Sequence, residues 1–134
     1  MNEDETRHPL VVKVALIGES GVGKTSIIDR YINNKYVQDQ ITTTGAIFST
    51  RLVSFPHEKF SIRFEIWDTA GQEKYRSLAK VIYKNASMIV LVYDITRRES
   101  FEQLKNYWVD EVKKNVKKNT SIIKNFIFSI CNCC

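Results

Sequence analysis

Residues 18–25 read Gly18-Glu19-Ser20-Gly21-Val22-Gly23-Lys24-Thr25 and match the pattern G-x-x-x-x-G-K-[ST] at every fixed position. The residues before them, 10–17, are apolar and β-branched and predict a buried strand. The residues after them, 25–33, place apolar side chains at helical spacing and predict a helix. A strand, this motif and a helix in succession form the context in which the motif binds phosphate.

The residue types of the motif suit a phosphate cradle. Gly18 and Gly23 let the backbone curl so that successive N–H groups point into one concavity at a helix N-terminus. Lys24 is placed to neutralise β- and γ-phosphates, and the Thr25 hydroxyl can ligate Mg²⁺. The expected phosphate-binding residues of the loop are Gly18, Ser20, Gly21, Val22, Gly23, Lys24, Thr25 and Ser26. The alternative is a glycine-rich structural turn followed by a chance Lys-Thr pair.

Composition favours one globular domain in a reducing compartment. The chain has 134 residues and three cysteines, all within its last four residues, which is too clustered a set to cross-link a fold. We expect a disordered arm at residues 1–9, a domain at 10–130 and a cysteine tail at 131–134. The N-terminus is polar, unlike a secretory signal, and no apolar run approaches a membrane span in length. These features indicate a cytoplasmic protein.

The net charge of +5 comes largely from lysines after residue 104. Such a run is usually a solvated helix face, with weak attraction to anionic membrane as the alternative. No motif supports nucleic-acid binding.

The rest of the chain predicts an α/β fold. Residues 34–45 read as an exposed loop, 47–55 and 60–67 as an antiparallel hairpin, 86–93 and 121–130 as further strands. One helix is expected to carry Tyr75, Leu78, Ala79 and Ile82 on one face, and another, opened by a Thr96/Glu99 capping box, to carry Phe101, Leu104, Trp108 and Val112 inward. This order implies a mostly parallel sheet with helices on both faces, and ligands at the carboxyl ends of its strands.

Asp68 directly follows the strand expected at 60–67. In a chain with a phosphate-binding loop, a carboxylate at this place suits Mg²⁺ coordination. The alternative is a turn residue or a helix cap.

Three stretches together resemble the Ras superfamily of small GTPases: residues 18–25, Trp67-Asp68-Thr69-Ala70-Gly71-Gln72-Glu73, and Val92-Tyr93-Asp94-Ile95-Thr96. Trp67, Tyr75-Arg76-Ser77-Leu78 and Ser100-Phe101 point to the Rab branch. The resemblance covers residues 10–115 and implies a P-loop fold and a slow, Mg²⁺-dependent GTPase. Such a protein switches between GTP and GDP in vesicle trafficking.

The resemblance also assigns roles to single residues. Thr43 matches the first-switch threonine, which binds Mg²⁺ and senses the γ-phosphate. Because three threonines run together here, Thr42 and Thr44 are the alternatives. Asp68 matches the second-switch aspartate, and Gly71 the glycine whose N–H meets the γ-phosphate. Gln72 matches the catalytic glutamine that orients the attacking water; the alternative is an exposed polar loop residue. Asp94 has no nucleotide role in the family and is expected to structure its loop.

The implied partners are an exchange factor, a GTPase-activating protein and effectors, all binding through the two switch loops. In the stretch Thr44-Gly45-Ala46-Ile47-Phe48, Ile47 stands where the family has an acid. That replacement puts the usual effectors in doubt.

The guanine-reading motifs of the family, Asn-Lys-x-Asp and Ser-Ala-Lys, do not occur in the 134 residues. The expected fold lacks the last strand and helix of the family's domain. The alternative function is therefore a truncated, non-catalytic form that binds nucleotide weakly and with little preference for guanine.

The terminal Cys133 and Cys134 resemble the paired cysteines that carry geranylgeranyl groups in many Rab proteins. Prenylation there would hold the protein on the cytosolic face of intracellular membranes. The alternative is a fragmentary or misread end of the chain.

Overall fold

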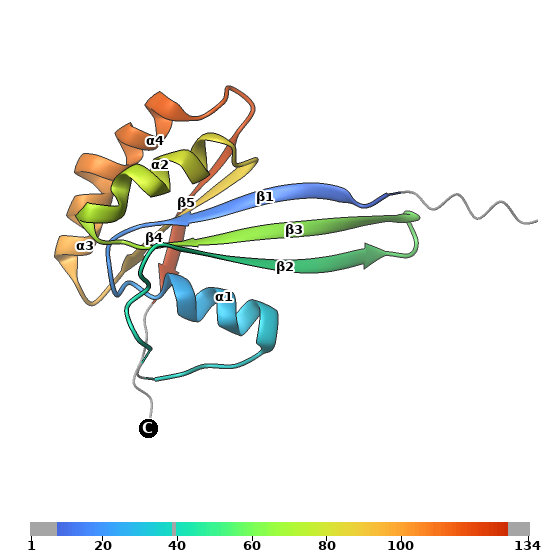
Figure 1. Cartoon of the computed structure of the whole chain (residues 1–134), viewed down its shortest axis with the longest axis horizontal. Coiled ribbons are helices and arrows are strands. Elements are labelled where there is room, and N and C mark those ends of the chain that lie inside the picture. Colours follow the sequence, from blue (N-terminus) through green and yellow to red (C-terminus); the bar gives the residue numbers. More distant parts are fainter. Residues whose placement is uncertain (1–7, 39, 129–134) are drawn as a thin grey trace, which may run out of the picture.

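Five strands form one sheet in the order β2-β3-β1-β4-β5 (Figure 1). The structure is a computed structural model that describes residues 8–38 and 40–128. The strands are β1 (Leu10–Ile17), β2 (Ala46–Phe55), β3 (Phe60–Thr69), β4 (Met88–Asp94) and β5 (Ser121–Phe128). The α-helices are α1 (Lys24–Asn33), α2 (Arg76–Lys84), α3 (Arg98–Gln103) and α4 (Val109–Asn115). A 3₁₀ turn, η1 (Glu73–Tyr75), precedes α2, and a π-helical turn, η2 (Leu104–Trp108), joins α3 to α4.

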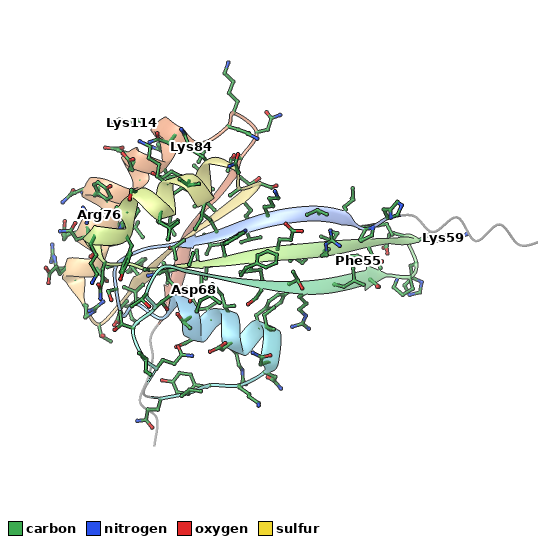
Figure 2. The ribbon with its side chains drawn as sticks, viewed as in Figure 1. Phe55, Lys59, Asp68, Arg76, Lys84 and Lys114 are labelled. Carbon is green, nitrogen blue, oxygen red and sulfur yellow. The ribbon has the colours of Figure 1, made fainter. Side chains whose placement is uncertain are left out.

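The pairing of the strands confirms the mostly parallel sheet. β1 lies between β3 and β4 and is parallel to both, and β4 is parallel to β5. β2 and β3 form the expected antiparallel hairpin. Its tip, marked by Phe55 and Lys59, projects away from the helices (Figure 2).

Alternate residues of β1 supply two separate cores, one on each face of the sheet. Ala15 and Ile17 pack with the cluster under α2, η2 and α4, whereas Val14 and Leu16 pack with the cluster under α1. Figure 1 shows α1 on one side of the sheet and α2, α3 and α4 on the other. Helices on both faces are therefore confirmed.

The register of β1 and β3 places the candidate site. Leu16 pairs with Asp68, so the end of β3 lies beside the start of the loop at 18–25. The Thr69 hydroxyl donates to the Leu16 carbonyl at 2.7 Å and fastens the two strand ends together. The carboxyl ends of both strands therefore meet at one edge of the sheet, as the strand order predicts.

The expected capping box at Thr96 is wrong. The α3 helix begins at Arg98, with Arg97 before it and no side-chain cap. Thr96 donates its N–H and its hydroxyl to Asp94 Oδ1, at 2.8 and 2.6 Å. Because the Asp94 carboxylate engages both donors, Thr96 serves the turn after β4 instead of the helix. The loop-structuring role expected of Asp94 is confirmed.

Phe101 is also placed differently from the expectation. Leu104, Trp108 and Val112 are buried as expected, whereas Phe101 is 41% exposed. Its ring tilts against Tyr93, with centroids 5.1 Å apart, near the end of β4. One side of the ring remains in solvent because the strand ends there.

β5 pairs with β4 through an irregular ladder. Val90 pairs with Ile123 and Val92 with Phe126, so Lys124 and Asn125 together oppose one residue of β4. A β-bulge accommodates the two polar residues within an otherwise apolar strand. Residues 129–130 of the expected strand, most of the expected arm and the cysteine tail lie outside the described residues. The domain limits stay a prediction.

Candidate functional site

The loop at residues 18–25 curls between the end of β1 and the start of α1. Gly23 precedes α1 with φ of 97°, in the left-handed region that a side chain disfavours. The first N–H groups of a helix lack intrahelical partners, and Gly23, Lys24 and Thr25 at the start of α1 line the cavity described below. The loop therefore has the form of an anion cradle.

Lys24 occupies the inside of this cradle. It is 5% exposed, and its Nζ donates to the carbonyls of Gly18 at 2.9 Å and Glu19 at 2.7 Å. Burial lowers the pKa of the Lys24 ammonium to about 8, against the raising effect of Asp68 and Glu19. Its solvation is incomplete, so a bound anion would be a favourable third partner.

This pKa shift predicts the pH dependence of stability in metal-free and nucleotide-free protein. Between pH 8 and the ordinary value of 10.5, the unfolded chain binds more protons at Lys24 than the folded chain. The free energy of unfolding therefore rises as the pH passes 8. At pH 10 this one group makes it about 2 kcal/mol larger than at pH 7. Urea unfolding of wild type and Lys24→Met with a chelator present measures it. A wild-type advantage that does not grow from pH 7 to pH 10 contradicts the prediction.

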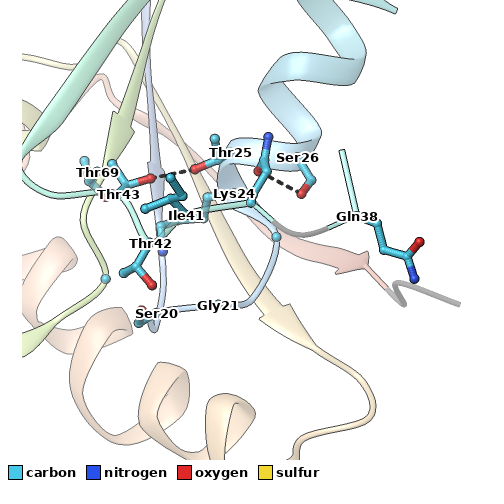
Figure 3. A pocket seen from close by; sticks show the side chains of 13 residues that line it. Ser20, Gly21, Lys24, Thr25, Ser26, Gln38, Ile41, Thr42, Thr43 and Thr69 are labelled. Atoms are coloured by element: carbon cyan, nitrogen blue, oxygen red, sulfur yellow. Dashed lines mark hydrogen bonds between the residues drawn. The ribbon is translucent and has the colours of Figure 1, made fainter. Parts of the chain in front are cut away.

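Three oxygen-bearing side chains converge beside the cradle. The Thr25 hydroxyl donates to Asp68 Oδ2 at 2.5 Å, and the Thr25 and Thr43 hydroxyls lie 2.8 Å apart. The Thr43 hydroxyl also lies 3.3 Å from Asp68 Oδ2. Figure 3 shows Thr25 and Thr43 facing each other at the edge of the cavity. Among the three neighbouring threonines, Thr43 supplies the hydroxyl that reaches this cluster.

The cluster fits a magnesium ion. Asp68 is 2% exposed, and its Oδ1 has no hydrogen-bond partner among the described residues. Burial raises the pKa of the Asp68 carboxyl, which hydrogen bonds from Thr25 and the charge of Lys24 partly oppose. No group of three or more His, Cys, Asp and Glu side chains gathers anywhere in residues 8–38 and 40–128. One carboxylate with two hydroxyls suits Mg²⁺, which prefers few carboxylates together with water and phosphate oxygens.

The cradle and the two threonines of the cluster line the same cavity of about 180 Å³, whereas Asp68 does not line it. Loop 34–45 contributes its other wall. Gln40 accepts from the Ser26 hydroxyl at 3.2 Å and donates to Asp29, which ties this loop to α1. The lining residues are Ser20, Gly21, Gly23, Lys24, Thr25, Ser26, Gln38, Gln40, Ile41, Thr42, Thr43, Thr69 and Gly71. Gln38 and Gln40 gave no signal in the sequence, where they are polar residues of a polar loop.

Gly71 and Gln72 differ in how close they come to the cavity. Gly71 lines it, and a Cβ there would lie 2.3 Å from the backbone N of Ser20. Gln72 is half-buried and does not line it; its carbonyl accepts from the Tyr75 N–H at 3.0 Å. Val22, another expected phosphate contact, is 1% exposed and packs in the core under α1.

Comparison with known proteins agrees with this geometry. The family described as "Ras family" matches residues 13–125. The chain is 43% identical over 115 residues to the Ypt/Rab-type GTPase YPT7 of Saccharomyces cerevisiae, covering 86% of this chain and 54% of that protein. It is 42% identical over 113 residues to the Ras-related protein RABA4a of Arabidopsis thaliana, covering 84% and 49%. It is 41% identical over 113 residues to the Ras-related protein Rab11A of Lotus japonicus, covering 84% of this chain and 49% of that protein. The chain thus spans about half the length of these curated relatives.

None of the helices within the described ranges combines the length and apolar character that crossing a bilayer requires.

Proposed function

Since this chain belongs to the Ras family and its relatives include Rab-type proteins, we propose that it is a Rab-type small GTPase. It binds GTP and GDP together with Mg²⁺ and hydrolyses GTP slowly. The observation that carries the proposal is the meeting of Thr25, Thr43 and Asp68 at the mouth of the cradle that holds Lys24. A structural glycine turn would not require a buried lysine with this oxygen cluster beside it.

Each group in the site has a separate task. The backbone N–H groups of the loop and the Lys24 ammonium bind the β- and γ-phosphates. Thr25, Thr43 and Asp68 hold Mg²⁺, which neutralises charge on the phosphate oxygens when bound. Gln72 orients the attacking water, so the chemistry is mainly positioning and electrostatics. An arginine from a partner would supply further transition-state stabilisation and set a useful rate.

The switch follows from which residues come from loops. Thr43 lies on loop 34–45 and Gly71 lies between β3 and η1, so both are held through the γ-phosphate and released after hydrolysis. An exchange factor, a GTPase-activating protein and effectors would read these segments. Ile47 and Phe48, 51% and 47% exposed, are accessible apolar side chains on β2, the strand that follows loop 34–45.

Vesicle trafficking on the cytosolic face of intracellular membranes is the cellular role that we propose. Prenylation of Cys133 and Cys134, which lie outside the described residues, would supply two lipid chains, enough for stable anchoring.

Titration with fluorescent GDP, with and without Mg²⁺, tests the proposal on the purified chain. The proposal expects Mg²⁺-dependent binding and displacement by GTP, and absence of both would overturn it.

Competition with ATP then tests the alternative of a phosphate site without guanine selectivity. A GTP preference above a hundredfold, about 2.8 kcal/mol, means that the base is read. A smaller preference favours the alternative.

Gln72→Leu is expected to slow GTP hydrolysis by at least tenfold while nucleotide affinity changes less than twofold. Leucine keeps the volume of glutamine and lacks the amide that orients water. Single-turnover hydrolysis measures the rate, and equilibrium titration of the same preparation serves as its control. An unchanged hydrolysis rate would exclude Gln72 as the water-positioning group.

A further inference from the structure

We propose that Glu19 is a positioning residue that couples the phosphate-binding loop to the segment carrying Gly71 and Gln72. This inference rests on the proposed function and concerns a residue at a variable position of the motif. The contacts that carry it join Glu19, Arg76 and Trp108, which are called the Glu19 clamp below.

The Glu19 carboxylate is held from two helical elements. Trp108, in the π-helical turn η2, donates its Nε1–H to Glu19 Oε1 at 3.0 Å. Arg76, the first residue of α2, places its Nη2 at 3.6 Å from the same oxygen. The Trp108 contact links residues far apart in sequence and is part-buried. The loop is therefore fixed by side chains on the helical face of the sheet opposite α1.

Arg76 is itself fixed by aromatic rings. Its guanidinium carbon lies 4.0 Å from the centroid of Tyr107 and 5.5 Å from that of Trp108. The rings of Tyr107 and Trp108 meet edge-on at 5.0 Å. Cation–π contacts of this kind hold the arginine in one orientation. Figure 2 shows Arg76 at the α2 end of the molecule, among the helices of that face.

The backbone of Glu19 connects the clamp to the phosphate site. Its carbonyl accepts from Lys24 Nζ at 2.7 Å. Its peptide with Ser20 also lies against Gly71, where an added Cβ would come within 2.3 Å of the Glu19 carbonyl carbon. Glu19 thus touches the phosphate-binding lysine through its carbonyl, Gly71 through its peptide and α2 through its carboxylate.

A specific consequence follows for nucleotide binding. Arg76 begins α2 only a few residues after Gly71, so the clamp limits how far residues 71–76 can move from the loop when no γ-phosphate is bound. A nucleotide with a γ-phosphate needs that segment in place, whereas a diphosphate does not. Without the clamp, the γ-phosphate must order the segment itself, which weakens triphosphate binding selectively.

One side of the clamp faces solvent. Glu19, Arg76 and Glu99 line a cavity of about 550 Å³ on the outer side of the loop, and the Arg76 and Glu19 side chains are 29% and 25% exposed. Glu99 is exposed and lies in α3. It offers a matched control, since Glu99→Ala removes the same charge from the same cavity without touching Arg76.

The test compares the affinity of GDP with that of a non-hydrolysable GTP analogue, both with Mg²⁺. The proteins are wild type, Glu19→Ala, Arg76→Ala, the double variant and Glu99→Ala. The ratio of analogue affinity to GDP affinity should fall about tenfold in both single clamp variants, within the usual range for coupling between sites. It should fall no further in the double variant and stay at the wild-type value in Glu99→Ala.

If a clamp variant loses affinity equally for both nucleotides, the affinity ratio is unchanged, the role of the clamp is merely structural and the coupling is overturned. If the losses of the two single variants add in the double variant, the two side chains act independently and the coupling is overturned as well. If Glu19→Ala fails to fold by circular dichroism, Arg76→Ala and Trp108→Phe, which keeps a ring and loses the N–H donor, carry the comparison. Wild type that binds neither nucleotide overturns the proposed function, and the coupling with it. Wild type that binds both with an unmoved ratio in the variants overturns the coupling alone.

Discussion

Lys24→Ala is expected to reduce the affinity for Mg²⁺-nucleotide by a hundredfold or more, with helical content unchanged. The Lys24 ammonium is buried in the cradle and already donates to two loop carbonyls, so it is held where phosphate oxygens would lie. Charge-assisted hydrogen bonds contribute about 1.5–3 kcal/mol each, so the loss of two exceeds a hundredfold in affinity. No other lysine of the described residues lines the cavity. Titration calorimetry with GDP and Mg²⁺ measures the effect.

Lys13→Ala is the matched control. Lys13 lies on β1, the same strand that leads into the loop, and its side chain is exposed. Its removal lowers the net charge by the same amount, so affinity should stay within about twofold, since exposed charges are strongly screened. Equal affinities for wild type and Lys24→Ala would contradict the assignment of Lys24 to the phosphates.

Gly18→Ala is expected to destabilise the fold by about 3 kcal/mol or more. An added Cβ would lie 2.1 Å from the carbonyl oxygen of Val92, in β4, which pairs with β1. A clash with backbone cannot be relieved by a change of rotamer, so β1 and β4 must separate or the loop must move. Urea unfolding followed by circular dichroism gives the change in the free energy of unfolding.

Gly21→Ala separates the clash from simple backbone strain. Gly21 has φ of 73°, and its added Cβ would meet nothing closer than Arg97 Nη1 at 3.8 Å. The cost there is the left-handed conformation alone, about 1 kcal/mol. A loss at Gly18 no larger than that at Gly21 would contradict the role of the Val92 contact.

Local patterns in the sequence predict the elements well because each depends on neighbouring residues. The alternation in residues 60–67 and the apolar run in 86–93 specify strands before any tertiary contact forms, and both appear in the structure. The placing of Asp68 beside the loop also follows, because parallel strands end at the same edge.

The predictions for Thr96 and Phe101 are wrong for two different reasons. At Thr96 two local signals compete, and at Phe101 the neighbouring strand ends. Thr96 has the spacing of a helix cap from Glu99, but the nearer carboxylate of Asp94 engages its donors first. Phe101 has the spacing of a core residue, yet it lies where β4 is ending.

The Glu19 clamp lies beyond sequence reasoning for a different reason. Glu19 and Trp108 belong to elements far apart in the chain, and an aromatic at helical spacing reads as core packing. Trp108 does pack in the core, at 1% exposed, while its indole N–H reaches the loop. The single ring serves both purposes, and only the tertiary structure distinguishes them.

The contact between Gly18 and Val92 has a consequence for the order of folding. The two residues are separated by more than half of the chain, so the loop takes its shape only when β4 has docked on β1. Closing so long a segment is slow compared with forming the helix α1, which needs local contacts alone. A peptide of residues 10–33 would carry the whole motif and remain unable to form the cradle. During refolding, pulse labelling should find the amides of residues 18–25 protected together with those of β4, after those of α1.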